Sequence, residues 1–134
     1  MNIRVAIVDD DKSVCRSLGR LLRAVGMETT SYPSAEAFLA NRKAQSFDCL
    51  ILDIHLGGMS GLDLQAMLVA EGETVPIIFI TAHDSVASRR EALAHGCAGF
   101  FRKADPGADI IAAIHAAVWH PEDATQTTAQ AIKE

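Results

Sequence analysis

Short apolar runs alternate strictly with longer amphipathic segments along this sequence, and that alternation restricts the possible folds more than any other feature. The runs lie at residues 3–8, 27–32, 49–52, 76–80 and 98–101. Each run predicts a buried strand, with 27–32 the weakest candidate, and the segment after each run has apolar residues at helical spacing. The sequence therefore predicts five strand–helix units in succession.

Capping residues mark the ends of the predicted helices. Gly26 and Gly96 are suited to end the first and the fourth helix, because glycine readily adopts the left-handed conformation that follows a helix. Asp84 is a candidate N-cap of the fourth helix, and Asp105 with Pro106 combines an N-cap with proline at the first helical position of the fifth. The second helix is predicted to begin at Pro33–Ser34 and to end at about Ala44. The third helix should end near Gly72, and the last at about Trp119.

Five strand–helix units in alternation predict an α/β fold in which a parallel sheet carries helices on both faces. Because crossovers between parallel strands are right-handed, few topologies remain. A chain of 134 residues suits one domain of this kind. The composition becomes polar after His120, so we expect residues 1–120 to form the domain and residues 121–134 a polar tail or linker stub.

The charge and the cysteines narrow the class of protein. Twelve basic residues against 17 acidic ones give a formal charge of −5, which argues against nucleic-acid binding through phosphate contacts. No apolar stretch approaches the roughly 18 residues that a membrane span needs. The three cysteines form no CxxC pair, which favours a reducing cytoplasm and a domain without disulfide or zinc. We therefore expect a cytoplasmic domain with neither nucleic acid nor membrane as partner.

Chemically active side chains stand where four of the predicted strands end. Asp9 and Asp10 follow the first strand, and Asp53 follows the third. Thr81 ends the fourth strand, and Lys103 lies just past the fifth. In an open parallel sheet, ligands bind at the carboxyl ends of the strands, near the point where the strand order reverses. We therefore expect the fold to gather these side chains at one edge of the sheet.

This set of side chains is typical of metal-assisted phosphoryl transfer. An aspartate can accept a phosphoryl group as a nucleophile, and its attack needs a divalent cation and positive donors to offset negative charge. Two carboxylates about 4 Å apart repel by roughly 4 kcal/mol at an effective dielectric of 20. A hard, oxygen-seeking ion such as Mg²⁺ would relieve that repulsion.

Each of these residues also has a purely structural explanation when it is taken alone. Residues 9–11 could form a solvated turn in which Asp11 caps the next helix. Asp53 could be a turn residue, Thr81 a cap or turn hydroxyl, and Lys103 a surface charge. Chance alone is a poor explanation for such side chains at the ends of four strands, so the pattern favours a phosphoryl-transfer site.

With these motifs the chain resembles a response-regulator receiver domain of bacterial two-component signalling, over residues 1 to about 120. The stretches that carry the resemblance are residues 7–11, 50–54, 59–64, 79–82 and 99–103. Residues 34–39 also resemble the receivers that precede LuxR-type helix-turn-helix output domains. The resemblance implies a doubly wound, flavodoxin-like sheet of five parallel strands in the order 2-1-3-4-5.

The resemblance implies a role for each acidic residue of the site. Asp53 would be the phosphoacceptor, and Asp9 with Asp10 would form the acidic pocket for Mg²⁺ or Mn²⁺. Asp10 would ligate the ion directly and Asp9 through water, and Asp53 would be a further metal ligand. The backbone carbonyl of His55 would complete the protein's share of the ligands.

The resemblance also implies how the signal enters and leaves. The phosphoryl group would come from a sensor histidine kinase or a histidine phosphotransfer protein, and the chain would catalyse only its own phosphorylation and slow dephosphorylation. Thr81 and Lys103 would contact the phosphoryl group. Phe100 occupies the aromatic switch position, which turns inward when Thr81 moves toward the phosphate. An interaction surface would change in response.

Two positions depart from the receiver pattern. Gly57–Gly58 stands in the loop after the phosphoacceptor where receivers usually have proline, which should loosen the loop that bears the His55 carbonyl. Ala104 stands where proline usually follows the lysine. Because a cis bond without proline costs roughly 3–4 kcal/mol, we expect a trans Lys103–Ala104 bond and a shifted loop path.

Two histidines lie two residues beyond strand-end site residues. His55 follows Asp53 at this spacing and His83 follows Thr81. They could be exposed loop residues, or one of them could position or screen the water that attacks the phosphorylated aspartate. A zinc site from this pair is disfavoured in a pocket suited to a hard cation.

Other functions fit the residues less well. A phosphatase of the haloacid-dehalogenase type needs a second aspartate two positions after the nucleophile, where this chain has His55. A flavodoxin-like FMN binder needs a phosphate loop after the first strand, where three aspartates would repel a phosphate. A degenerate receiver that acts as an unphosphorylated protein-interaction module stays open as the alternative.

The last predicted helix suggests an interface. Ile110, Ile114, Ala117 and Val118 form one apolar stripe, which would dock the helix on the sheet. Ile111, His115 and Trp119 follow at a spacing of four on an adjoining face. This second face either widens the buried contact or forms a homodimer or effector surface with the fourth helix and the fifth strand.

Overall fold

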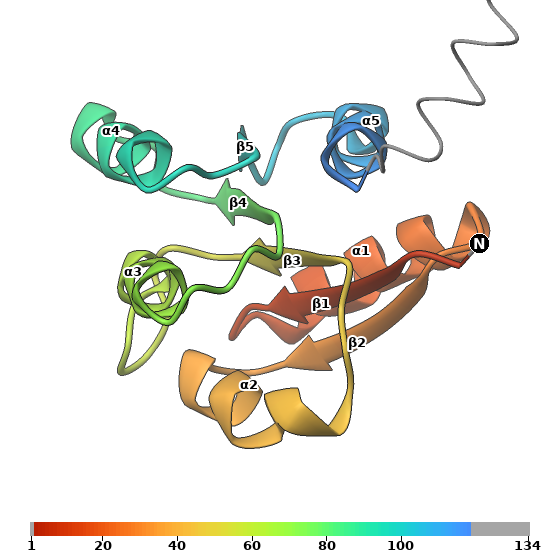
Figure 1. Ribbon diagram of the computed structural model, residues 1–134. Helices are drawn as coiled ribbons and strands as arrows, with labels where there is room; N and C mark the ends of the chain where they lie inside the picture. The colour runs from red at the N-terminus through yellow and green to blue at the C-terminus, as the bar shows by residue number, and fades with distance from the viewer. Residues whose placement is uncertain (1, 119–134) are drawn as a thin grey trace, which may run out of the picture.

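The computed structural model describes residues 2–118, in which strands and helices alternate as the sequence predicts. Predictions for Trp119 and for the segment 121–134 lie outside these residues. Figure 1 shows the elements, which are β1 (Arg4–Val8), α1 (Lys12–Ala24), β2 (Glu28–Tyr32), α2 (Ala35–Asn41), the 3₁₀ turn η1 (Arg42–Ala44), β3 (Cys49–Leu52), α3 (Gly61–Ala70), β4 (Ile77–Thr81), α4 (Val86–Ala94), β5 (Gly99–Arg102) and α5 (Gly107–Ala117). Within the described residues, no helix is long and apolar enough to cross a membrane.

The strands form one parallel sheet in the order β2-β1-β3-β4-β5, which confirms the expected topology. The connection from β1 leads outward to β2, and the next connection crosses back to β3 on the other side of β1. The strand order therefore reverses between β1 and β3. Ligands of doubly wound sheets bind outside the carboxyl ends of the strands at such a point.

Two apolar layers cover the sheet, as expected for strands that are apolar on both faces. Val5 and Ile7 of β1 face the layer formed by α1 and α5, whereas Ala6 and Val8 face α2, α3 and α4. Figure 1 shows α1 and α5 together on one side of the sheet and the other three helices on the opposite side. Ile110 and Ile114 of the predicted α5 stripe are buried in the first layer, with Val118 partly buried beside them.

The ends of the helices agree only in part with the predictions. Gly26 and Gly96 follow α1 and α4 with φ of +86° and +82°, as expected for C-terminal glycines. The N-cap of α4 is Ser85 and not Asp84, because the Ser85 hydroxyl accepts the backbone N–H of Ser88 at 3.1 Å. The carboxylate of Asp84 pairs instead with a side chain of α4.

The start of α5 also differs from the prediction. Pro106 is the N-cap and Gly107 the first helical residue, with no side-chain capping bond. Asp105 does not cap, because its carboxylate accepts the backbone N–H of Arg102 at 2.8 Å across the turn between β5 and α5. The predicted second helix is divided into α2 and η1 and reaches Ala44 as expected.

Candidate functional site

The pairing of the strands places the predicted site residues side by side. Val8 of β1 is in register with Leu52 of β3, so Asp9 and Asp53 leave adjacent strands at the same level. Thr81 of β4 is paired with Arg102 of β5, directly before Lys103. The site therefore lies across the carboxyl ends of β1, β3, β4 and β5, as the sequence predicts.

Three carboxylates gather at this edge of the sheet. Each of Asp9, Asp10 and Asp53 offers an oxygen, and these oxygens all lie within 4.8 Å of one another. Asp9 and Asp53 are only 4% and 5% exposed, whereas Asp10 is exposed. Such a group of oxygens is suited to a hard divalent cation.

Asp11, the third consecutive acid, is not part of this cluster. It is the N-cap of α1, where its carboxylate accepts the backbone N–H groups of Ser13 and Val14 at 2.9 and 3.3 Å. The structural explanation that the sequence left open therefore applies to Asp11.

Burial and charge together oppose ionisation of Asp9. Desolvation raises the pKa of Asp9 above its ordinary value, and the negative charge of Asp53 raises it further. A hydrogen bond from the backbone N–H of Asp11 and the neighbouring ammonium group of Lys103 lower this pKa but do not cancel the rise. Three carboxylates therefore face one ammonium group in a largely buried setting, which favours a bound cation.

Lys103 supplies the positive charge of the site. Its Nζ lies 3.1 Å from Oδ2 of Asp53 and 3.1 Å from Oδ2 of Asp9. Burial alone would lower the pKa of Lys103, but the hydrogen bonds and charges of Asp53 and Asp9 outweigh it and raise this pKa. The Lys103–Ala104 bond is trans, as predicted, and the side chain nevertheless reaches both carboxylates.

The hydroxyl of Thr81 is engaged by its own loop. Thr81 is fully buried, and its Oγ1 accepts the backbone N–H of His83 at 3.1 Å. The same hydroxyl donates to the carbonyl of His83 at 3.4 Å. Thr81 thus ends the strand next to β3, while its hydroxyl is bonded to the loop between β4 and α4.

The two candidate histidines contact each other, which the sequence reasoning missed. The rings of His55 and His83 meet edge to face, with 5.2 Å between centroids and 85° between planes. Both residues are exposed, and the backbone N–H of His55 donates to Asp53 Oδ1 at 3.3 Å. Their equal offset from neighbouring strand ends was the signal that could have predicted the contact.

Glu36 and Gly61 anchor the loop after Asp53, a role that the sequence did not predict for them. Glu36 of α2 accepts the backbone N–H of Met59 at 2.9 Å, and this hydrogen bond lowers the pKa of Glu36. Gly61 begins α3 so close to the Asp53 carbonyl that a Cβ at this position would clash with the carbonyl. Despite Gly57–Gly58, the loop is therefore tied to α2 and packed against Asp53.

The switch candidate Phe100 lies on β5 and is partly buried. Its ring packs near that of Phe79 on β4, with 6.1 Å between centroids. The guanidinium carbon of Arg89, on α4, lies 4.6 Å from the centroid of Phe100. The sequence reasoning missed Arg89, because nothing in the spacing of residues marks it as a neighbour of β5.

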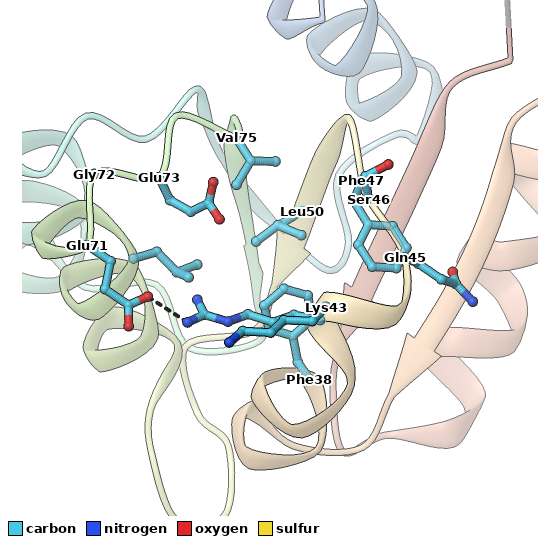
Figure 2. A pocket seen from close by; sticks show the side chains of 12 residues that line it. Phe38, Lys43, Gln45, Ser46, Phe47, Leu50, Glu71, Gly72, Glu73 and Val75 are labelled. Carbon is cyan, nitrogen blue, oxygen red and sulfur yellow. Dashed lines mark ion pairs between the residues drawn. The ribbon is translucent and has the colours of Figure 1, made fainter.

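A hollow at the other end of the sheet contains none of the predicted site residues. It has a volume of about 570 Å³ and is lined in part by Phe47, Leu50 and Val75, at or before the amino ends of β3 and β4. Glu71, labelled in Figure 2, forms an ion pair in this hollow with Arg42, with 2.8 Å between nitrogen and oxygen. The acidic cluster is therefore the candidate site on chemical grounds.

Comparison with known proteins identifies the family. A family model described as response regulator receiver domain matches residues 5–115. The response regulator protein TmoT of Ectopseudomonas mendocina is 39% identical over 114 residues, which are 85% of this chain and 52% of TmoT. The chain spans about half the length of the curated relatives it matches.

Solved structures agree with this result. The crystal structure of FixJ-N has a TM-score of 0.81 and 34% identity, covering 90% of this chain and 96% of that one. A response regulator receiver protein from Burkholderia phymatum has a TM-score of 0.77 and 39% identity. The match covers 87% of this chain and 95% of that one. The chain belongs to the response regulator receiver domain family.

Proposed function

We propose that this receiver domain accepts a phosphoryl group on Asp53 in a reaction that depends on Mg²⁺ or Mn²⁺. The observation that supports the proposal most strongly is the position of Asp53, which shares the acidic cluster with Asp9 and Asp10 and lies 3.1 Å from Lys103 Nζ. Asp9 shares both features, and the receiver-like stretch 50–54, at the end of β3, is what assigns the acceptor role to Asp53. The donor would be the phosphohistidine of a sensor histidine kinase or a histidine phosphotransfer protein.

The acidic cluster fits the metal ion that this reaction requires. Asp10 and Asp53 would ligate the ion directly, together with the backbone carbonyl of His55, and Asp9 would act through water. Three oxygens within 4.8 Å and the raised pKa of Asp9 both support a site for a hard cation. When bound, the ion supplies positive charge that offsets the carboxylates and the incoming phosphoryl oxygens.

The transfer itself needs few groups of the chain. A carboxylate oxygen of Asp53 forms a bond to phosphorus while the bond from phosphorus to the histidine nitrogen breaks, and the nitrogen leaves with the electron pair. Lys103 would move from the carboxylate of Asp53 to an oxygen of the new phosphoryl group. The chain would promote only this reaction and the slow hydrolysis of its own product.

The response would begin at Thr81. Its hydroxyl would leave the His83 backbone and donate to the phosphoryl group, which would move the loop between β4 and α4. Phe100 would turn inward into the space that this movement opens. The surface formed by α4, β5 and α5 would then present a different face to a second copy of the chain or to a downstream effector.

Mass spectrometry after incubation with acetyl phosphate and Mg²⁺ tests the proposal. We expect one phosphoryl adduct, located on Asp53, and we expect it to be lost in the presence of EDTA. Asp53→Asn should abolish labelling, whereas Asp109→Asn, an exposed residue in the first turn of α5, is the matched control and should be labelled normally. Absence of any adduct in the folded wild-type chain would favour the alternative, an unphosphorylated interaction module.

A further inference from the structure

The ring of Phe100 is held by residues of two elements. Phe79, which is fully buried in β4, packs near it, and Arg89 reaches over it from α4. A guanidinium group within about 6 Å of an aromatic centroid is attracted by the electrons of the ring. At 4.6 Å, Arg89 is well inside that range.

Arg89 is held in place by the loop that follows Thr81. Its Nη2 lies 3.0 Å from Oδ2 of Asp84, so an ion pair joins this loop to the first half of α4. Asp84, Arg89 and Phe100 therefore form a chain of contacts that leads from the loop between β4 and α4 to β5.

The helix α4 buries one residue in the core. Ala92 is the buried residue of this helix, and its carbonyl accepts the side-chain amide of Gln65 at 2.9 Å. Val86, at the start of the helix, is 70% exposed. The contact of Arg89 with Phe100 therefore joins the first half of α4 to β5.

We propose that Arg89 is a positioning residue that holds Phe100 in the orientation of this structure and opposes its inward turn. The inference rests on the proposed function, because the turn regulates the chain only if Asp53 is phosphorylated. Because Arg89 is exposed, an inward turn would move the ring away from its guanidinium group, and the contact would then stabilise only the state before the turn. Loss of a partly exposed cation–π contact corresponds to about a two- to fivefold change in that equilibrium.

The first test compares the rates at which acetyl phosphate labels Asp53. Arg89→Met keeps the length of the side chain without its charge, and we expect labelling about two- to fivefold faster than in the wild type. Arg89→Lys keeps a cation and should restore most of the wild-type rate. Arg90→Met, one residue further along α4, is the matched control and should leave the labelling rate unchanged. When Phe100→Leu is already present, adding Arg89→Met should not change the labelling rate further.

The second test uses the unphosphorylated chain, so that it does not depend on Asp53. With 4-fluorophenylalanine at the five phenylalanines, the ¹⁹F signal of Phe100, assigned from Phe100→Leu, should move in Arg89→Met and not in Arg90→Met. An unmoved signal would overturn the inference, as would equal labelling rates in wild type and Arg89→Met. Failure of the wild type to be labelled on Asp53 would instead refute the proposed function.

Discussion

Asp9, Asp10 and Asp11 are consecutive in the sequence but have three different surroundings. Asp9 is buried and bonded to Lys103, Asp10 is exposed at the mouth of the cluster, and Asp11 caps α1. Position relative to the end of β1, rather than residue type, therefore decides what each carboxylate does. The difference between Asp10 and Asp11 provides a test of the cation site.

Asp10→Ala should weaken Mg²⁺ binding by roughly tenfold or more, because a direct charged ligand is lost. Isothermal titration calorimetry measures this directly. Asp11→Ala removes a neighbouring acid of the same type and should leave Mg²⁺ affinity nearly unchanged, while lowering the free energy of unfolding by about 1 kcal/mol through the lost N-cap. Equal losses of Mg²⁺ affinity in both variants would show that general negative charge, and not ligation by Asp10, attracts the ion.

The raised pKa of Asp9 predicts a pH dependence of stability without Mg²⁺. Because this pKa lies above the ordinary value of 3.8, the folded state favours the protonated form. The contribution of Asp9 to stability is complete below pH 3.8 and is lost as the pH rises through the raised pKa. Asp9→Asn, which does not titrate, should therefore gain stability relative to the wild type as the pH rises.

Urea unfolding in EDTA at a series of pH values measures that difference. A difference between Asp9→Asn and the wild type that stays constant from pH 4 to 7 would contradict the assigned cause. Addition of Mg²⁺ should reduce the difference at neutral pH, since the ion stabilises the ionised form in the wild type.

Among the elements, the strands could be predicted closely because both faces of the sheet are covered. The apolar run 49–52 coincides with β3, and the run 76–80 is displaced by one residue from β4. Helix starts were predicted less well, since several polar residues compete for each cap. Asp84 and Ser85 are both good N-cap residues, and only the ion pair of Asp84 with Arg89 explains why Ser85 caps α4.

The contact between the start of α3 and the carbonyl of Asp53 gives a prediction at this scale. Gly61→Ala places a Cβ against the Asp53 carbonyl, so the start of α3 or the loop must shift. We expect a loss of about 1–3 kcal/mol in the free energy of unfolding, measured by urea denaturation, and slower labelling of Asp53 by acetyl phosphate. Gly57→Ala is the matched control, because a Cβ there meets no atom within 4 Å. The prediction would be wrong if both variants were as stable as the wild type.

In the whole molecule, the parallel sheet explains why residues distant in the sequence could be assigned to one site. Asp9, Asp53 and Lys103 all lie directly beyond strand ends, and the topology alone brings them together. The contacts that the sequence did not predict are made by loop residues or by exposed side chains of helices. They include the ring contact of His55 with His83 and the contact of Arg89 with Phe100. The spacing of apolar residues predicts the buried face of a helix, as it does for Ile110 and Ile114, but it does not predict which exposed side chain reaches a neighbouring element.

The exposed apolar residues of α4 predict a change of assembly on activation. Val86 and Leu93 lie seven residues apart on this helix and are 70% and 59% exposed. Residues at this spacing share one helix face, and such a face gains stability when a second surface covers it. We expect the chain with beryllofluoride and Mg²⁺, a mimic of the phosphorylated state, to form a homodimer through α4 and β5. The untreated chain should sediment as a monomer.

Sedimentation velocity with Leu93→Glu tests this assignment of the surface. The added charge should prevent dimerisation with beryllofluoride, because burial of an unpaired carboxylate at the interface is unfavourable. Val25→Glu is the matched control, since Val25 is also exposed, at 48%, but lies at the end of α1 away from α4 and β5. Dimerisation of Leu93→Glu with wild-type affinity would exclude the α4 face, and a monomer in every condition would leave an effector as the partner of this surface.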